Sequence, residues 1–297
     1  MVLIVLLLKQ GIVMVDMLTP VVAALALLSG EAPVPPASPP SVRSVESFPF
    51  YSSKNRMLVI ARFNGGPPAP LVFDTGTNGN IIDTVFAQSI GLPKVGPSNS
   101  VDGATGKPIP GFRTRITGMS VSGVSIQDGP ANVIDFKRHD EAGIIGPNSF
   151  PGRLVEIDFA GSRIRVLPDA PANRPAGEGA PHLDGLPAVV VTVAGQSFEA
   201  LVDTGNDAVL TLPLSMAKTL PLKAPPVLKG KTRSAGGVQD AYEAQIDGPV
   251  RVGHLVLESP QVFFNETGDP NVGMPVLRRA RLVIDHSGGR TWLEPAP

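Results

Sequence analysis

Short apolar runs separated by Gly- and Pro-containing stretches repeat along the chain from residue 57 onward. Two of them, Leu71-Val72-Phe73 and Leu201-Val202, each lead directly into an acidic residue, Asp74 or Asp203. Short apolar runs bounded by turn residues are typical of buried strands. Gly and Pro, 32 of each, supply turns for many such strands. The pattern therefore predicts an all-β fold in which two strands each deliver a carboxyl group into a loop.

The apolar spacing changes at two places, where it becomes i, i+4, i+8. The first series is Ile82, Phe86 and Ile90, and the second is Leu212, Met216 and Leu220. This spacing puts the apolar side chains on one face of a helix. We therefore expect one short helix after each acidic residue.

The two halves of the chain repeat the same landmarks in the same order. Corresponding positions are separated by 127 to 130 residues: Asp74 and Asp203, Phe86 and Met216, Gly123 and Gly253, Gly146 and Gly273, Asp158 and Asp285. So regular an offset indicates internal duplication. It predicts two lobes, residues 57–168 and 185–297, joined by a Pro- and Gly-rich linker, 169–184.

Each lobe ends in the pattern of a strand, a tight turn and a returning strand. The two stretches are LVEIDFAGSRIRVLP and LVIDHSGGRTWLEP, which turn at Gly161-Ser162 and at Gly288-Gly289. Asp158 and Asp285 stand just before these turns, where hydrogen bonding to the turn explains an acidic residue without catalysis.

The N-terminus, residues 1–30, carries two apolar runs broken by Lys9 and Asp16. Neither run reaches the length of a bilayer span, but residues 21–28 match a signal-peptide core and precede small residues. We expect a periplasmic or secreted protein. An uncleaved anchor that associates the protein with the membrane is the alternative, as is a later start at Met14 or Met17. Residues 31–56 are expected to form a Pro-rich spacer.

Composition excludes several functions. The net charge is -1 and no basic run is present, so nucleic acid is not an expected partner. Cys is absent, which excludes disulfides, thiolate metal sites and a cysteine nucleophile. The four His show no metal-ligand spacing, so we predict neither a metal nor a cofactor.

Both acidic residues begin the tripeptide Asp-Thr-Gly, at Asp74 and at Asp203. A turn is the structural explanation for one copy, but a turn alone does not repeat a whole unit. An apolar strand ending in this tripeptide, a helix, a Gly-rich hairpin and the apolar-Gly motif GIIG resemble retropepsin-like (retroviral-type) aspartic proteases. Here two such units are fused in one chain, as in an exported protein of bacterial type.

The resemblance implies a two-lobed acid-protease fold with pseudo-twofold symmetry, and a monomer that forms an intramolecular pseudo-dimer. Asp74 and Asp203 would be the catalytic pair that activates water to hydrolyse a peptide or protein substrate, because two carboxyl groups that share a proton supply both a base and an acid. That pairing explains why a single chain carries the motif twice. The supporting loop residues would be Thr75, Gly76, Thr77, Thr204, Gly205 and Asn206. The flap candidates over the substrate are Gly103, Ala104, Thr105, Gly106, Gly236 and Gly237.

The second lobe departs from the family pattern at two positions. Asn206 stands where Thr77 stands in the first lobe, and the apolar-Gly motif becomes Asn271-Val272-Gly273. These asparagines favour an alternative, a proteolytically silent module that binds peptides or partners. Retention of both acids favours the enzyme, because two adjacent like charges without a catalytic role would only repel each other. Glycoside hydrolysis also uses two carboxyl groups, but they stand further apart.

Overall fold

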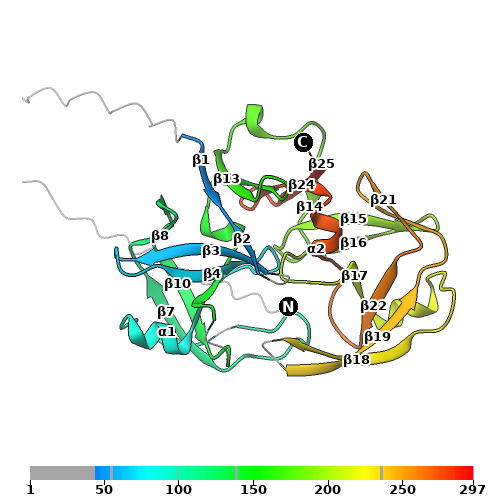
Figure 1. Cartoon of the computed structure of the whole chain (residues 1–297), viewed down its shortest axis with the longest axis horizontal. Coiled ribbons are helices and arrows are strands. Elements are labelled where there is room, and N and C mark those ends of the chain that lie inside the picture. Colours follow the sequence, from blue (N-terminus) through cyan, green and yellow to red (C-terminus); the bar gives the residue numbers. More distant parts are fainter. Residues whose placement is uncertain (1–43, 54–55, 99, 138–139, 235–236, 297) are drawn as a thin grey trace, which may run out of the picture. The chain divides into compact units, whose positions relative to one another are not determined.

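Strands make up most of the structure, a computed structural model that describes residues 44–53, 56–98, 100–137, 140–234 and 237–296 (Figure 1). The expected signal peptide or anchor, residues 1–30, lies outside the described residues, as do most of the spacer and Gly236. Within the described part, no helix is long and apolar enough to cross a membrane.

The first lobe is built on one large sheet. Its strand order is β6-β7-β10-β5-β11-β4-β3-β8-β9, with β2 paired to β3. The strands are β2 (Tyr51–Ser53), β3 (Arg56–Phe63), β4 (Ala69–Phe73), β5 (Asn80–Asp83), β6 (Gly96–Pro97), β7 (Gly111–Ile116), β8 (Met119–Val121), β9 (Val124–Ser125), β10 (Gly129–Ile134) and β11 (Gly143–Ile145).

Apart from β2, the second lobe repeats this sheet strand for strand, in the order β18-β19-β22-β17-β23-β16-β15-β20-β21. In both lobes the strand before the acidic residue runs parallel to the strand of the apolar-Gly motif, β4 with β11 and β16 with β23. The duplication predicted from the sequence is confirmed. The strands are β15 (Ala188–Val193), β16 (Gln196–Val202), β17 (Leu210–Pro213), β18 (Val227–Ser234), β19 (Gly237–Gln245), β20 (Pro249–Val252), β21 (Leu255–Glu258), β22 (Gln261–Asn265) and β23 (Asn271–Val272).

A third sheet takes strands from both lobes, in the order β1-β13-β12-β24-β25-β14. At its centre β12 (Arg153–Asp158) pairs antiparallel with β24 (Ala280–Asp285), so the terminal hairpins of the two lobes share one ladder. β13 (Arg163–Pro168) and β25 (Arg290–Pro295) complete the hairpins. Their turns are closed as expected: Asp158 accepts a hydrogen bond from the Gly161 amide, and Asp285 accepts one from Gly288.

The outer strands of the shared sheet come from segments that the sequence assigned to the spacer and the linker. β1 (Glu46–Pro49) pairs with β13, and β14 (Ala180–Pro181) pairs with β25. Phe48 of β1 is fully buried. The spacer and linker therefore add strands to the body, and the linker also holds a 3-10 helix, η2 (Pro171–Asn173).

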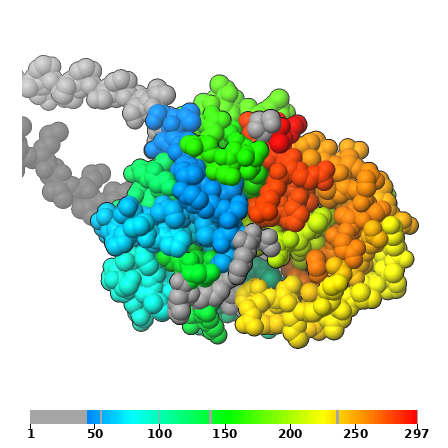
Figure 2. All heavy atoms as spheres, viewed as in Figure 1, coloured from blue at the N-terminus to red at the C-terminus, as the bar shows by residue number. Residues whose placement is uncertain are grey.

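The centre of the shared sheet combines apolar side chains with a buried carboxylate, Glu156. Leu154, Ile157 and Leu282 are fully buried there. Glu156 is also buried and accepts hydrogen bonds from Arg165 at 2.8 Å and from Arg281 of the other lobe at 3.2 Å. In Figure 2 the atoms of the first lobe, blue to green, and of the second lobe, yellow-green to orange, gather in two adjoining regions.

The helices differ between the lobes. α1 (Thr84–Ser89) follows β5 and is capped by Asp83, whose carboxylate accepts from the amides of Val85 and Phe86. At the predicted place in the second lobe stands a 3-10 helix, η3 (Leu214–Lys218), preceded by Pro213, which has no side chain able to cap. The α-helix of that lobe is α2 (Met274–Leu277), which follows Gly273. At the equivalent place in the first lobe, after Gly146, stands the 3-10 helix η1 (Pro147–Ser149).

Candidate active site

The two acidic residues occupy equivalent positions at the ends of buried strands. Phe73 at the end of β4 and Val202 at the end of β16 are fully buried. The amide of Asp74 donates to the Ile145 carbonyl at 2.8 Å, and the amide of Asp203 donates to the Val272 carbonyl at 3.0 Å. Each carboxyl-bearing residue is thus fixed by the neighbouring strand of its own lobe.

Reciprocal hydrogen bonds between two threonines hold the loops of the two lobes together. The amide of Thr75 donates to Thr204 Oγ1, and the amide of Thr204 donates to Thr75 Oγ1, both at 3.1 Å. Each hydroxyl also donates across the lobes, Thr75 to the Val202 carbonyl at 2.6 Å and Thr204 to the Phe73 carbonyl at 2.9 Å. Both threonines are fully buried, so these bonds fix the strand ends without competition from water.

The glycines of both tripeptides lie against the carboxyl groups. The Gly76 amide donates to Asp74 Oδ1 at 2.8 Å, and the Gly205 amide donates to Asp203 Oδ1 at 2.7 Å. A Cβ on Gly205 would lie 2.7 Å from Asp74 Oδ2 and 3.0 Å from Asp203 Oδ1. A Cβ on Gly76 would lie 2.9 Å from Asp203 Cγ. Glycine is therefore required here because the backbone passes so close to both carboxyl groups.

The two carboxyl groups form an electrostatically coupled pair. Burial, the negative charge of Asp203 and a hydrogen bond with the Asp203 carboxyl raise the pKa of Asp74 well above its usual value, against the opposing effect of the Gly76 amide. Two carboxyl groups in such proximity cannot both ionise at low cost, so the pair retains a proton. Two carboxyl groups that share one proton can offer an acid and a base at the same time.

The second lobe has polar support from Asn206, which the sequence predicted, and from Asn271, which it did not. Asn271 Nδ2 donates to Asp203 Oδ2 at 2.7 Å, and Asn206 Nδ2 donates to Asn271 Oδ1 at 2.7 Å. The sequence flagged both asparagines as departures from the family pattern, but it gave no sign that they are in contact. Thr77, expected to support the first carboxyl, instead donates to the Gly79 carbonyl at 2.9 Å within its own loop.

The flap candidates of the first lobe contact the second lobe, through residues other than the candidates Gly236 and Gly237. Gly103, Ala104, Thr105 and Gly106 form the tip of a turn that we call the first hairpin, residues 100–109, closed by a hydrogen bond from the Asp102 amide to the Lys107 carbonyl at 2.9 Å. In the second lobe Gly237 opens β19, which pairs with β18.

Three second-lobe side chains bind the first hairpin. The hydroxyl of Thr267 donates to the Ala104 carbonyl at 2.8 Å, and Gln239 Nε2 donates to the same carbonyl at 3.3 Å. Ser234 at the end of β18 donates to Asp102 Oδ1 at 2.9 Å. Through Ser234 and Gln239, the first hairpin is therefore joined to the hairpin of β18 and β19 in the second lobe, which we call the second hairpin.

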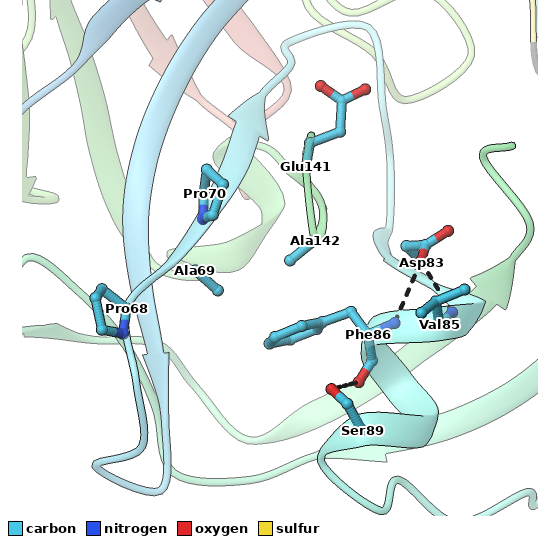
Figure 3. Close-up of a pocket in the computed structure, with 9 residues that line it drawn as sticks. All are labelled: Pro68, Ala69, Pro70, Asp83, Val85, Phe86, Ser89, Glu141 and Ala142. Carbon is cyan, nitrogen blue, oxygen red and sulfur yellow. Dashed lines mark hydrogen bonds between the residues drawn. The ribbon is translucent and has the colours of Figure 1, made fainter. Parts of the chain in front are cut away.

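A pocket of about 280 Å³ lies elsewhere, beside α1 in the first lobe (Figure 3). The Phe86 ring projects into it, and Pro68, Ala142 and Glu141 stand around it. Neither Asp74 nor Asp203 belongs to its lining. The paired carboxyl groups, not this pocket, are the candidate site. In the described part of the chain, no group of three or more His, Cys, Asp and Glu is placed to hold a metal ion.

The comparisons with known proteins agree with this geometry. The model of the aspartyl protease family matches the chain twice, over residues 59–148 and 189–276. The first match contains Asp74 and the second contains Asp203. A search of curated proteins found no match. Two tandem matches that cover more than half of the chain, on two equivalent lobes, establish that the chain belongs to the aspartyl protease family.

Proposed function

We propose that this chain is an aspartic endopeptidase in which Asp74 and Asp203 together activate water. One observation carries the proposal: two carboxyl groups from separate lobes lie together against Gly205, where an added Cβ would be 2.7 Å from Asp74 Oδ2 and 3.0 Å from Asp203 Oδ1. The reciprocal bonds of Thr75 and Thr204 hold the two loops in this arrangement. The raised pKa of Asp74 supports it, because an acid must still hold its proton when the base is charged.

The chemistry follows from one proton shared by two carboxyl groups. The charged carboxylate takes a proton from water as the water oxygen bonds to the peptide carbonyl carbon. The protonated carboxyl gives its proton to the carbonyl oxygen, so the product is a neutral diol and the pair again holds one proton. The pair then protonates the amide nitrogen and takes a proton from a diol hydroxyl as the C–N bond breaks, which releases an amine and a carboxylic acid.

The alternative, a silent binding module, depended on Asn206 and Asn271. These residues now have a place in the hydrogen bonding of Asp203, which supports the enzyme. The substrate we propose is an extended peptide that lies beneath the joined hairpins as an additional strand.

A peptide library tests the function. The purified full chain is incubated with the library at pH values from 3 to 8, with and without a statine-type inhibitor, and products are identified by mass spectrometry. We expect cleavage that the inhibitor blocks and that the Asp74→Asn/Asp203→Asn double variant lacks. Peptide binding without any cleavage would contradict the enzyme and favour the binding module.

We also propose that the protein is exported and acts as a monomer. The apolar run of residues 21–28 supports export, and the presence of both aspartates in one chain supports the monomer. Fractionation of cells that express the full chain should place it outside the cytoplasm, and light scattering should give the mass of a single chain. A cytoplasmic protein would overturn the first proposal, and a stable dimer would overturn the second.

A further inference from the structure

The two carboxyl groups have unequal surroundings. Each accepts one amide hydrogen bond on Oδ1, from Gly76 or from Gly205. Asp203 accepts a further bond on Oδ2 from Asn271. Ile144 holds the corresponding position in the first lobe, because it pairs with Val72 as Asn271 pairs with Leu201. A hydrocarbon side chain cannot donate, so the support for the two acids differs at this position.

The amide of Asn271 has a defined orientation because a backbone group fixes it. The Ala208 amide, which can only donate, bonds to Asn206 Oδ1 at 2.9 Å. Asn206 must then present its NH₂ group to Asn271, and that group donates to Asn271 Oδ1 at 2.7 Å. Asn271 is left with its own NH₂ group facing Asp203 Oδ2. Thr211 Oγ1 also accepts from Asn206 Nδ2 at 3.1 Å, consistent with the same orientation.

Few other charges act on this carboxyl group. Asp74 is the titratable group that faces Asp203 from the first lobe. Of the elements next to Asp203, β17 and β23 carry no titratable side chain, Glu199 of β16 is exposed, and Asp207 on the same loop is exposed. The Asn271 amide is therefore the side-chain donor on Asp203 that has no counterpart at the corresponding position of the first lobe.

We propose that Asn271 is a positioning residue that, oriented by Asn206, holds the negative charge of the pair on Asp203. A donated hydrogen bond stabilises a carboxylate more than a neutral carboxyl. Asp203 is then the base that takes the proton from water, and Asp74 is the acid that protonates the carbonyl oxygen. This assignment rests on the proposed function.

The pH profile of kcat/KM for the Asn271→Val variant tests the assignment. If the single charge lies on Asp203, Asn271 stabilises the singly and the doubly ionised pair equally. Loss of the donor then moves only the acid limb, to higher pH by about one unit, which is a tenfold change in proton concentration. If the charge lies on Asp74, Asn271 stabilises only the doubly ionised pair, and only the basic limb moves.

Ile144→Val is the matched control, because it puts valine at the position of the first lobe that corresponds to Asn271. Ile144→Val should leave both limbs where they are in the wild-type protein. Asn206→Ala should move the acid limb in the same direction as Asn271→Val but by less, because Asn271 keeps its donor and loses only its orientation. A uniform fall in activity with both limbs unmoved in the Asn271 and Asn206 variants, or a shift of the basic limb, overturns the proposal.

A second readout does not require turnover. In protein with ¹³C-labelled aspartate carboxyl groups, assigned with the Asp74→Asn and Asp203→Asn variants, the Asp203 carbon should show the charged chemical shift when the pair holds one proton. The Asn271→Val variant should need a higher pH to reach that shift. If the wild type cleaves no peptide, the proposed function fails while this titration still tests the inference. If the Asp74 carbon, and not the Asp203 carbon, shows the chemical shift of a charged carboxylate, the proposal is overturned.

Discussion

Thr75 and Thr204 exchange hydrogen bonds across the two lobes, each amide donating to the other hydroxyl at 3.1 Å. Replacement of Thr75 by Val keeps the shape but leaves the Val202 carbonyl and the Thr204 amide without these partners. Buried groups left unpaired cost about 1–3 kcal/mol each, so the two together cost about 2–6 kcal/mol. We expect thermal unfolding of Thr75→Val to show a loss of stability in this range, together with a loss of kcat. Thr75→Ser keeps the hydroxyl and should remain close to the wild type, and equal losses in the two variants would contradict this role.

The close approach of Gly205 to Asp74 gives a second prediction. In Gly205→Ala the new methyl group displaces flexible carboxyl groups and not the backbone, so the fold should survive while kcat falls about 100-fold. Gly79→Ala is the matched control, because a Cβ there meets nothing within 4 Å. Steady-state kinetics and thermal unfolding of both variants give the comparison. Unchanged kcat in Gly205→Ala would show that the carboxyl geometry tolerates displacement.

The bond between Ser234 and Asp102 joins the first hairpin to the second lobe. Its removal in Ser234→Ala should speed amide hydrogen exchange in residues 102–107 by about fivefold, the effect of about 1 kcal/mol. Ser89→Ala serves as the control, because the Ser89 hydroxyl bonds within α1. Exchange that is equally slow in both variants would mean that the hairpins are not held together by this contact.

His182 and His286 lie with their ring centroids 6.1 Å apart. Burial, and for His182 also the neighbouring His286, lowers the pKa of both below 6.5. The unfolded chain therefore takes up protons first as the pH falls, so the stability from this pair is complete above pH 6.5 and is lost progressively below it.

The unfolding temperature of His286→Gln should therefore decline less than that of the wild type as the pH falls below 6.5. His254→Gln removes an exposed histidine outside the pair and should behave as the wild type does. Parallel declines in all three proteins would show that the pair does not contribute.

The lobes were predictable because their strands follow from local patterns that occur twice. An apolar run and a turn residue are visible in sequence, and their constant offset reveals the second copy. Contacts that depend on strand register are not visible in this way. Asn271 reaches Asp203 only because β23 lies beside β16, with Leu201 opposite Asn271. From the sequence alone, Asn271 was only a polar residue at a position where the family motif has an apolar one.

The two edge strands of the shared sheet could not be predicted from the local sequence pattern either. β1 and β14 come from Pro-rich segments with little apolar alternation, limited to Phe48 of β1 and the following Phe50, and they become strands because the shared sheet offers unpaired edges. The type of helix formed by residues 214–218 was also not predictable from local spacing. Its apolar spacing matches that of α1, but Pro213 replaces the capping carboxylate of Asp83, and the segment forms a 3-10 helix.

The central claim is that Asp74 and Asp203 act as one unit, and the kinetics of Asp74→Asn, Asp203→Asn and the double variant on one cleaved peptide test it most directly. We expect each single replacement to lower kcat/KM by about 1,000-fold or more, and the double replacement to cost little beyond that, because groups that act as a unit are not additive. Circular dichroism should show that all three variants keep the β-rich fold. Activity retained in Asp203→Asn but abolished in Asp74→Asn would contradict the account and would indicate that two chains each supply Asp74.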